Sequence, residues 1–404
     1  MSILWVAAAA FGFFAGLCLV VGLVAPGPLS PAAVVACLLC CLGAAWSSAG
    51  LAALYGSYAP AIASVFFSAA TCFIGYRIAA SLLLDVLTVP SASSVQGTLA
   101  SDKLAVILAD AEPHRYDPHV PAARLKRIER TDAATLSTGV LPLVFLAERV
   151  RYRALRGPHP ARYIVEAVTD AVRSRLHEPL ADLAVEVAYV DSSPNLASLV
   201  ARARPSSVVL IELGASGSLP FLEARLEAER AAASYLTCPP SVWRDERMAL
   251  RLRDRILDRV PEDTRASTGV ALFGSGIPDA WHAQSASWLE DETYFLTRAT
   301  VLLEEAGLPA QAIRHAWLDW QEPSLAEAIR HLAATGSDRI VVCPATILYP
   351  DLSTMLDVSR DVRDARLPEH VQVTVLPPWG DDEVLVEILA SRIADAFGLE
   401  TTVA

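Results

Sequence analysis

The stretch VALFGSGIPDAW, residues 270–281, predicts a buried strand followed by a loop that contains two glycines and a proline. An apolar run of this length, bounded by turn-forming residues, is typical of a strand inside a parallel sheet. Ser275 stands in the middle of the loop. Ligands of α/β proteins bind at the carboxyl ends of such strands, so this loop is the first candidate for a functional site.

The sequence on both sides of this loop alternates short apolar runs with longer amphipathic segments. Strands are predicted at 104–109, 183–190, 206–213, 268–273, 312–319, 338–345 and 371–378. Helices are predicted at 161–176, 195–203, 220–236, 241–257, 292–307, 323–336, 351–365 and 381–397. Alternating strands and helices require right-handed crossovers and mostly parallel sheets. We therefore predict two similar doubly wound α/β halves, at 103–258 and 259–404.

The first hundred residues differ from the rest in composition, because Arg77 and Asp85 are their only charged residues. Three apolar runs, at about 3–24, 31–56 and 59–87, each reach the roughly 20 residues needed to cross a bilayer. The first run lacks the basic start of a cleaved signal peptide, and two further runs follow it. We therefore predict a membrane domain of three transmembrane helices at 1–90 and a linker at 91–102.

Lysines and arginines indicate the orientation in the membrane, since short loops on the cytoplasmic side carry an excess of them. The loops between the three apolar runs have none. Basic residues follow the third run, at Lys103 and in RLKRIER at 124–130. This pattern favours an integral protein of a bacterial cytoplasmic membrane whose soluble C-terminal part lies in the cytoplasm.

Composition also disfavours several classes of function. The net charge of −12 belongs to the soluble part, which argues against nucleic-acid binding because that needs a basic face. No GxGxxG or GxxxxGK(S/T) motif follows the first predicted strand, so nucleotide binding has little support. Five of the seven cysteines lie in the apolar runs, and no disulfide framework is implied. The GSG at 274–276 is shorter than the GxSxG pattern of serine hydrolases.

Three motifs of the second half occur in the order of a known family. They are FGSGIP at 273–278, a segment from WQEP to PATI at 320–347, and YPDLSTML at 349–356. In this order they resemble the ferrochelatases, two-domain α/β enzymes that insert ferrous iron into a porphyrin. Two stretches of the first half, 151–163 and 185–200, match that family more loosely. The resemblance covers about residues 103–398 and implies a tetrapyrrole ligand, such as a porphyrin or haem, and ferrous iron.

The resemblance also shows where this chain departs from the family. The family's cleft histidine falls on Ser275 and its glutamate on Ser353, and those two groups are held to bind metal or to take up pyrrole protons. A serine hydroxyl is a poor base and a weak ligand for ferrous iron at neutral pH. Asp351 and His282 are the candidates to replace them as metal ligands. Their alternative roles are a helix cap for Asp351 and a surface or core position for His282.

Aromatic residues near the predicted strand ends are candidates for an apolar wall against a flat macrocycle. They are Trp281, Trp288, Trp317, Trp320 and Tyr349, and ordinary packing is the alternative for such residues. The segment HRYDPH at 114–119 combines two histidines and an aspartate, which suits either contact with a metal in transit or a solvated loop.

We therefore expect a membrane-anchored, ferrochelatase-like protein with a tetrapyrrole- or haem-related function. Two alternatives stay open. In one, the chain is a metal–tetrapyrrole lyase with an eroded or rewired site around Ser275, Ser353 and Asp351. In the other, it is a non-catalytic pseudo-chelatase that acts as a tetrapyrrole-binding or assembly subunit of a membrane complex. The expected partners are the lipid bilayer, a tetrapyrrole, and either a membrane protein or further copies of the chain.

Overall fold

The structure is a computed structural model that describes residues 2–88, 101–176, 183–231 and 235–398. The chain divides into two compact units. The first contains Met1–Ala92 and Arg115–Pro158, and the second contains Ser93–His114 and His159–Ala404. Residues 115–158 therefore leave the second unit after its first strand and belong with the N-terminal helices.

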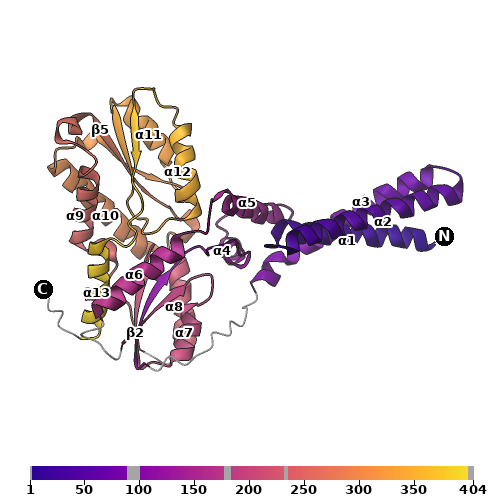
Figure 1. The fold of residues 1–404 in the computed structure, drawn as a ribbon, viewed down its shortest axis with the longest axis horizontal. Helices are drawn as coiled ribbons and strands as arrows, with labels where there is room; N and C mark the ends of the chain where they lie inside the picture. The colour runs from indigo at the N-terminus through magenta and orange to yellow at the C-terminus, as the bar shows by residue number, and fades with distance from the viewer. Residues whose placement is uncertain (1, 89–100, 177–182, 232–234, 399–404) are drawn as a thin grey trace. The chain divides into compact units, whose positions relative to one another are not determined.

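The first unit is built on three long antiparallel helices, α1 (Ser2–Val24), α2 (Leu29–Tyr55) and α3 (Ala59–Leu87) (Figure 1). Each of them is long and apolar enough to cross a membrane. Their bounds agree with the three predicted apolar runs to within two residues.

Glycines allow α1 and α3 to approach each other closely. A Cβ atom at Gly16 would lie 2.1 Å from the carbonyl oxygen of Cys72, and one at Gly75 would lie 2.2 Å from that of Phe13. Gly12, one turn before Gly16, meets the carbonyl oxygen of Ser68 in the same way. Small residues that bring backbones together are the usual contact between helices in a membrane.

Two shorter helices, α4 (His119–Arg130) and α5 (Leu141–Ala154), complete the first unit. Neither is among the helices predicted above. They share a buried apolar cluster with the ends of α1 and α3 that lie next to them: Val20, Val24, Leu83, Leu84, Ala122, Leu125, Leu141 and Phe145.

The second unit contains two four-stranded parallel sheets. The first has the order β2-β1-β3-β4 and consists of β1 (Lys103–Ala109), β2 (Leu183–Tyr189), β3 (Ser207–Leu213) and β4 (Tyr235–Thr237). The second has the order β6-β5-β7-β8 and consists of β5 (Thr268–Gly274), β6 (Ile313–Trp317), β7 (Arg339–Pro344) and β8 (Gln372–Val375). The identical strand order confirms the predicted pair of similar parallel-sheet α/β halves.

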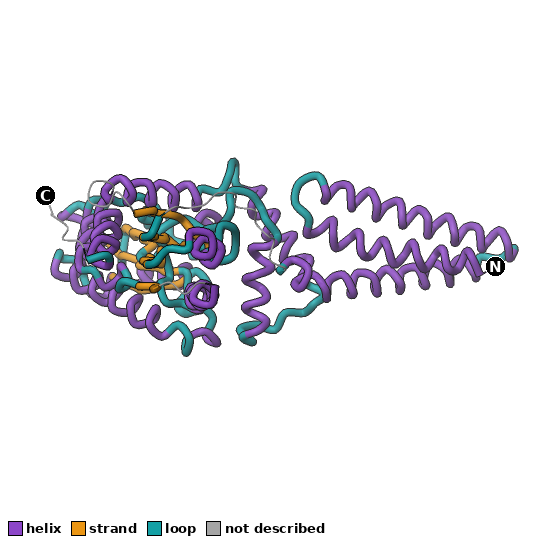
Figure 2. The backbone as a smooth tube through the Cα atoms, turned by 90° about the horizontal axis from the view of Figure 1, so that it is seen from below, coloured by secondary structure: helices purple, strands orange, loops and turns teal. Residues whose placement is uncertain are grey.

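Helices surround the strands of the second unit (Figure 2). They are α6 (Ala161–Leu176), α7 (Leu196–Ala203), α8 (Leu219–Ala231), α9 (Glu246–Leu257), α10 (Ala286–Glu305), α11 (Leu325–Ala334), α12 (Leu352–Asp364) and α13 (Glu383–Ala396). The last helix, α13, packs against α6 and β3, so the C-terminal segment covers the first sheet rather than the second.

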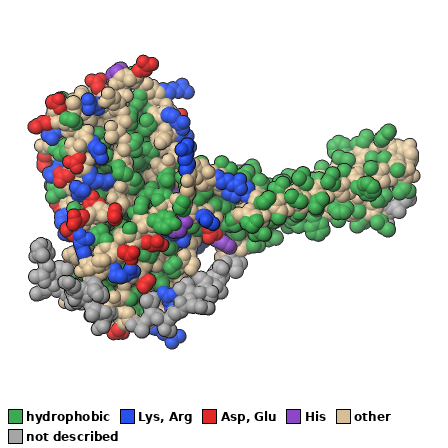
Figure 3. Space-filling view, viewed as in Figure 1, with side chains coloured by type: hydrophobic (Ala, Val, Ile, Leu, Met, Phe, Trp, Pro, Cys, Tyr) green, Lys and Arg blue, Asp and Glu red, His purple; other side chains and the backbone are tan. Residues whose placement is uncertain are grey.

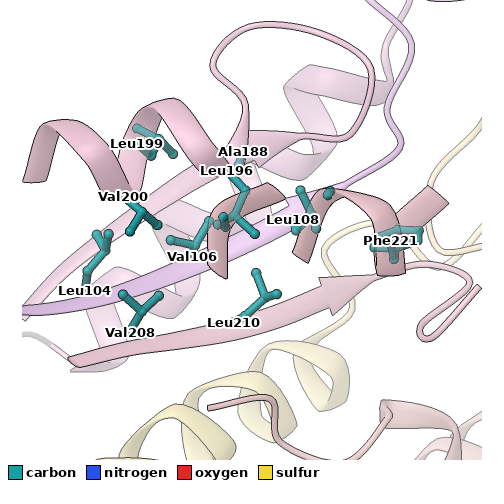
Figure 4. Close-up of a cluster of buried hydrophobic side chains, with 12 residues drawn as sticks. Leu104, Val106, Leu108, Ala188, Leu196, Leu199, Val200, Val208, Leu210 and Phe221 are labelled. Carbon is teal, nitrogen blue, oxygen red and sulfur yellow. The ribbon is translucent and has the colours of Figure 1, made fainter. Parts of the chain in front are cut away.

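Each sheet has its own apolar core, because helices cover the inner strands. Every residue of β5 is buried, as are all residues of β1 after Lys103. In the first half, Val106, Leu108 and Leu210 lie under α7 and α8 (Figure 4). In the second half, Phe273 packs with apolar residues of α11 and β7. Strands buried on both faces have the continuous apolar sequences from which these elements are predicted.

Two predicted elements differ in the structure. The predicted helix at 220–236 is α8, which ends at Ala231, and its last residues belong to β4, paired with β3. The predicted helix at 241–257 is a short 3₁₀ turn at Val242–Arg244 followed by α9. Asp245 separates them because its side chain accepts the backbone N–H of Arg247 and so caps α9.

Candidate functional site

The candidate site lies where the carboxyl ends of the two sheets meet within the second unit. Two hydrogen bonds join the halves there. The hydroxyl of Tyr349, after β7, donates to the carbonyl oxygen of Leu213 at the end of β3, over 3.1 Å. The backbone N–H of Leu352 donates to Oε2 of Glu112, which follows β1, over 2.8 Å. The loop after β7, which the sequence predicts to carry chemistry, therefore contacts the ends of β1 and β3 in the first half.

A buried pair, Glu112 and His159, lies at the centre of this junction. The two side chains are 6% and 0% exposed, and His159 Nε2 is 3.1 Å from Glu112 Oε2. The other ring nitrogen, His159 Nδ1, accepts the backbone N–H of Ala161 over 3.3 Å, which holds the ring beside the carboxylate. The same oxygen accepts the first N–H of α12, whose positive end stabilises a negative charge. Glu112 thereby links the β1 loop to the start of α12 and lies beside His159, two residues before α6.

Tyr349 lies among the carboxylates of this junction. Burial raises the pKa of the Tyr349 phenol well above its ordinary value, and the nearby charges of Asp110, Asp351 and Glu112 act in the same direction. The phenol therefore keeps its proton and acts as the donor to Leu213. Three carboxylates around one site give the junction a negative character, which attracts cations.

The loop after β5 has a backbone geometry that requires glycine. Gly276 has a φ of +79°, and a Cβ atom there would lie 2.0 Å from the carbonyl oxygen of Asp319. Backbone hydrogen bonds from Leu318 to Gly274 and from Asp319 to Ser275 hold the loop against the turn that follows β6. Ser275 is exposed at the end of this strand. The structure therefore presents the Ser275 side chain on a rigid turn.

The two serines predicted as site residues follow neighbouring strands, since Ser275 comes directly after β5, Ser353 comes in the helix after β7, and β5 pairs with β7. Ser353 is half-buried in the first turn of α12, which follows β7. Asp351 is the N-cap of that helix: its carboxylate accepts the N–H of Thr354 over 2.6 Å, and Thr354 in turn bonds to the backbone N–H of Asp351. The carboxylate of Asp351 is therefore engaged in holding the start of α12.

His282 lies on the other side of the β5 loop, towards the turn after β6. Its Nε2 atom is 3.3 Å from the side-chain nitrogen of Gln321 and 3.5 Å from a carboxylate oxygen of Asp279. The side chain is 38% exposed. An imidazole and a carboxylate thus lie together at the end of the Ser275 loop.

The structure places the aromatic residues predicted to contact a macrocycle in different environments. Trp288 belongs to an aromatic cluster with Trp243, Phe295 and Trp379, in which the Trp243–Trp288 ring centroids are 6.2 Å apart. Trp281 is buried at 6% exposure, whereas Trp320 is 48% exposed on the turn after β6. Trp320 is therefore the most accessible of the predicted tryptophans.

The HRYDPH segment is also divided. His114 belongs to the second unit, where its ring stacks on Tyr163 with centroids 3.8 Å apart. His119 belongs to the first unit and begins α4. Among the described residues, no group of three or more His, Cys, Asp or Glu side chains is arranged to hold a metal ion.

Glu292 on α10 is a second buried carboxyl group near the strand ends of the second half. It is 3% exposed, and its Oε1 atom accepts the hydroxyl hydrogen of Thr346, which follows β7, over 2.9 Å. Burial raises the pKa of Glu292 above 4.5, while Thr346 and the indole of Trp317 oppose the shift. The same oxygen would lie 2.6 Å from a Cβ atom at Gly274. Glu292 thus packs against Gly274 at the start of the β5 loop and binds Thr346 in the loop after β7.

A glutamine at position 292 is expected to stabilise the protein increasingly as the pH rises. The folded state binds the Glu292 proton more tightly than the unfolded state does, so wild-type stability falls between the unfolded pKa of about 4.5 and the raised folded value. Glutamine cannot ionise and keeps an acceptor for Thr346. The melting temperature of E292Q should therefore exceed that of wild type by more at pH 8 than at pH 5. E290Q, on the exposed neighbouring position, is the control, and equal pH dependence in wild type and E292Q would contradict the argument.

Sequence reasoning did not identify Glu112, His159 or Glu292 as site residues. Glu112 lies two residues before the HRYDPH segment, directly after a predicted strand, which is a usable signal. Glu292 occupies an apolar position of its helix, four residues after Trp288 and three before Phe295, and that pattern would have marked it as buried. The contribution of His159 depends on a contact with Glu112 that no local pattern indicates.

Comparisons with known proteins match the second half to chelatases. Residues 294–396 match the model of the CbiX family. A sirohydrochlorin cobaltochelatase of Saccharolobus solfataricus is 29% identical over 134 residues, which are 32% of this chain and 93% of that protein. A protein of the same name from Saccharolobus islandicus is 25% identical over the same length.

Two solved structures are similar at low identity. SirB from Bacillus subtilis with Fe³⁺ is 12% identical and has a TM-score of 0.44, covering 74% of this chain and 98% of SirB. CbiX, described as the terminal enzyme for biosynthesis of siroheme in denitrifying bacteria, is 14% identical with the same TM-score, covering 73% and 99%. The sequence match supports a chelatase-like second half, as the motifs suggested, and the matching model is that of CbiX. Residues 294–396 are therefore similar to the CbiX chelatase family, a branch different from the ferrochelatases.

Proposed function

We propose that this chain is a membrane-anchored, CbiX-type protein that binds a cyclic tetrapyrrole at the junction of its two sheets without inserting a metal into it. The chelatase relationship of the second half supports the ligand class. The three apolar helices of the first unit support the anchoring, and the basic residues that follow them support a cytoplasmic location of the soluble unit.

The observation that carries this proposal is the pair Ser275, directly after β5, and Ser353, in the first turn of the helix that follows the neighbouring strand β7. Metal insertion displaces two pyrrole protons, so it needs a group that accepts protons near neutral pH. Neither hydroxyl does so unaided. The junction carboxylate Glu112 is 6% exposed, already accepts the backbone N–H of Leu352, and lies 3.1 Å from Nε2 of His159. Binding without insertion is therefore the activity that these residues support best.

The ligand is proposed as a macrocycle of the sirohydrochlorin type, on which the curated relatives act. A porphyrin or haem is the alternative from the motif resemblance. Trp320 and the half-buried Trp317 on the turn after β6 are the aromatic side chains proposed to contact the ring. In this function the chain would hold its ligand for a membrane-protein partner or for a second copy of itself.

A second candidate keeps metal insertion, with cobalt or ferrous iron as substrate. It is favoured by the His282–Asp279 pair at the end of the Ser275 loop, where the closest approach is 3.5 Å. In this candidate His282 binds the metal and Asp351 supplies a carboxylate in place of Ser353. Since Asp351 also caps α12, its test variant is D351N, which keeps a capping oxygen.

Titration of the full-length chain in nanodiscs tests both candidates. Sirohydrochlorin and protoporphyrin are added separately, and saturable changes in their visible spectra measure binding. Cobalt or ferrous iron is then added, and insertion is followed from the spectrum of the metallated ring. We expect binding of one macrocycle, with insertion no faster than in protein-free solution. Insertion by wild type that is lost in His282→Ala or D351N would favour the second candidate, and absence of binding would overturn the tetrapyrrole proposal.

The double variant S275H/S353E is expected to gain insertion activity. It places an imidazole in the loop after β5 and a carboxylate at the start of α12. A positioned general base raises the rate of a reaction by about a hundredfold or more. The matched control is S359H/S174E, which introduces the same groups at exposed positions on α12 and α6. Equal insertion rates in the two double variants would contradict the assignment of these serines to the former metal site.

A further inference from the structure

The helix α5 has two apolar faces, of which one is exposed. Its inner face is buried: Leu141 and Phe145 pack with Val20 and Val24 of α1. Arg149 on the same face is 8% exposed and donates to the carbonyl oxygens of Gly22 and Ala25, at 3.0 and 2.8 Å, and to Ser30 Oγ, at 2.7 Å. These contacts fix α5 to the turn between α1 and α2.

The outer face of α5 carries an apolar stripe flanked by arginines. Leu143 and Val150 are 49% and 52% exposed, and the exposed Ala147 and Ala154 continue the stripe at helical spacing. At 100° per residue, Arg151 and Arg153 fall on opposite sides of it. An apolar stripe with basic residues along its borders is the pattern of a helix that lies in the interface of a membrane.

Residues 115–158, which we call the collar, are tied to the ends of α1 and α3. Lys126 Nζ lies 2.9 Å from Asp85 Oδ1, and His119 Nδ1 lies 2.6 Å from the carbonyl oxygen of Leu87. The Tyr76 hydroxyl donates to the carbonyl oxygen of Gly139 over 2.8 Å, about three turns before α3 ends. The 18 residues from Ala59 to Tyr76 span about 27 Å, close to the thickness of a hydrocarbon core. The collar therefore begins at the depth where a bilayer would end.

The charge of the collar is opposite to that of the whole chain. It contains nine Lys or Arg and four Asp or Glu residues, a net charge of +5, in a chain of net charge −12. Figure 3 shows basic side chains at the end of the apolar helices and none along their visible length. Anionic lipid headgroups attract basic residues held near the membrane surface.

We propose that the collar binds the headgroups of anionic phospholipids, with the outer stripe of α5 inserted among them. This inference rests on the membrane anchoring in the proposed function. The bilayer is the occupant that the observations favour, because α5 is attached to helices long enough to span it and has arginines on both sides of its apolar stripe. A protein that covers the same stripe is an outcome of the test below.

Photo-crosslinking tests the insertion of α5. The full-length chain carries p-benzoylphenylalanine in place of Val150, in nanodiscs of equal parts phosphatidylcholine and phosphatidylglycerol. We expect lipid adducts by mass spectrometry. Leu39 on α2, 61% exposed, is the anchoring control, and Leu226 on α8, 45% exposed, is the soluble control. Adducts at position 39 without any at 150, or protein adducts alone at 150, would overturn the collar proposal. Absence of adducts at 39 would instead refute the anchoring itself.

The preference for anionic lipid is tested with arginine variants. In wild type, the adducts at position 150 should favour phosphatidylglycerol over phosphatidylcholine. R151Q/R153Q/R156Q should lose this preference, by up to about fivefold for each arginine. The matched control, R230Q/R339Q/R363Q, removes three exposed arginines from the second unit and should keep it. Equal lipid preference in both triple variants would show that the collar arginines do not bind headgroups.

Discussion

Glu112→Ala is expected to destabilise the second unit by about 2–6 kcal/mol, because it leaves two buried polar groups without their carboxylate neighbour at about 1–3 kcal/mol each. The carboxylate accepts the backbone N–H of Leu352 and lies 3.1 Å from Nε2 of His159, and both groups would lose this buried polar neighbour. Since Leu352 begins α12 and Glu112 follows β1, the substitution also removes a link between the two halves. Tetrapyrrole binding, which is proposed to need this junction, should weaken with it.

Urea unfolding followed by tryptophan fluorescence measures this loss, because six of the eight tryptophans belong to the second unit. Glu112→Gln keeps an oxygen acceptor for one donor and should cost about 1–2 kcal/mol. Glu369→Ala changes an exposed carboxylate and should shift stability by less than about 0.5 kcal/mol. A loss for Glu112→Ala no larger than that of Glu369→Ala would show that the junction does not hold the halves together.

Gly276→Ala is expected to lower the free energy of unfolding by about 3 kcal/mol or more and to abolish tetrapyrrole binding. The left-handed φ of +79° is unfavourable for alanine by about 1 kcal/mol. In addition, the new methyl group would meet the backbone oxygen of Asp319 at 2.0 Å, so the turn after β6 has to move. That movement breaks the backbone hydrogen bonds from Leu318 and Asp319 to the Ser275 loop, each worth about 1 kcal/mol.

Gly336→Ala is the matched control for this prediction. Gly336 also has a left-handed φ, of +97°, but a Cβ atom there would have no heavy atom within 4 Å. Gly336→Ala should therefore lower the free energy of unfolding by about 1 kcal/mol, which is the cost of the left-handed backbone conformation for alanine. Urea midpoints of the two variants separate the steric contribution from the conformational one. Equal losses would mean that the loop relaxes without disturbing the β6 turn.

The elements of the second unit were largely predictable because their signals are local. Continuous apolar runs indicate buried parallel strands, and 3.6-residue periodicity indicates the helices between them. β4 was not predicted because its three residues, Tyr235–Thr237, continue the sequence pattern of a helix. They form a strand by pairing with β3. The first-unit helices α4 and α5 were missed since they bury their apolar residues against the ends of other helices rather than against a sheet.

The candidate site was predictable only in part. The sequence placed Ser275 directly after one strand and Ser353 in the helix after another, and the structure shows that these two strands are neighbours. The cap formed by Asp351 with Thr354 is equally local, since the two residues are three apart. No sequence pattern indicated that Glu112 would reach Leu352, because the two residues are 240 positions apart.

By itself, the sequence determined three apolar helices and two repeated strand–helix series, with Ser275 in the loop after one of the strands. These properties depend on residues that are close together in the chain, so they can be predicted from the local spacing of apolar residues. The tertiary structure alone decided which strand ends face each other, that Glu112 and His159 form the buried link, and that residues 115–158 leave the second unit to pack on the apolar helices. The physical reason is that a buried polar group or an apolar face gains stability only from the partner that covers it, and that partner is distant in the chain.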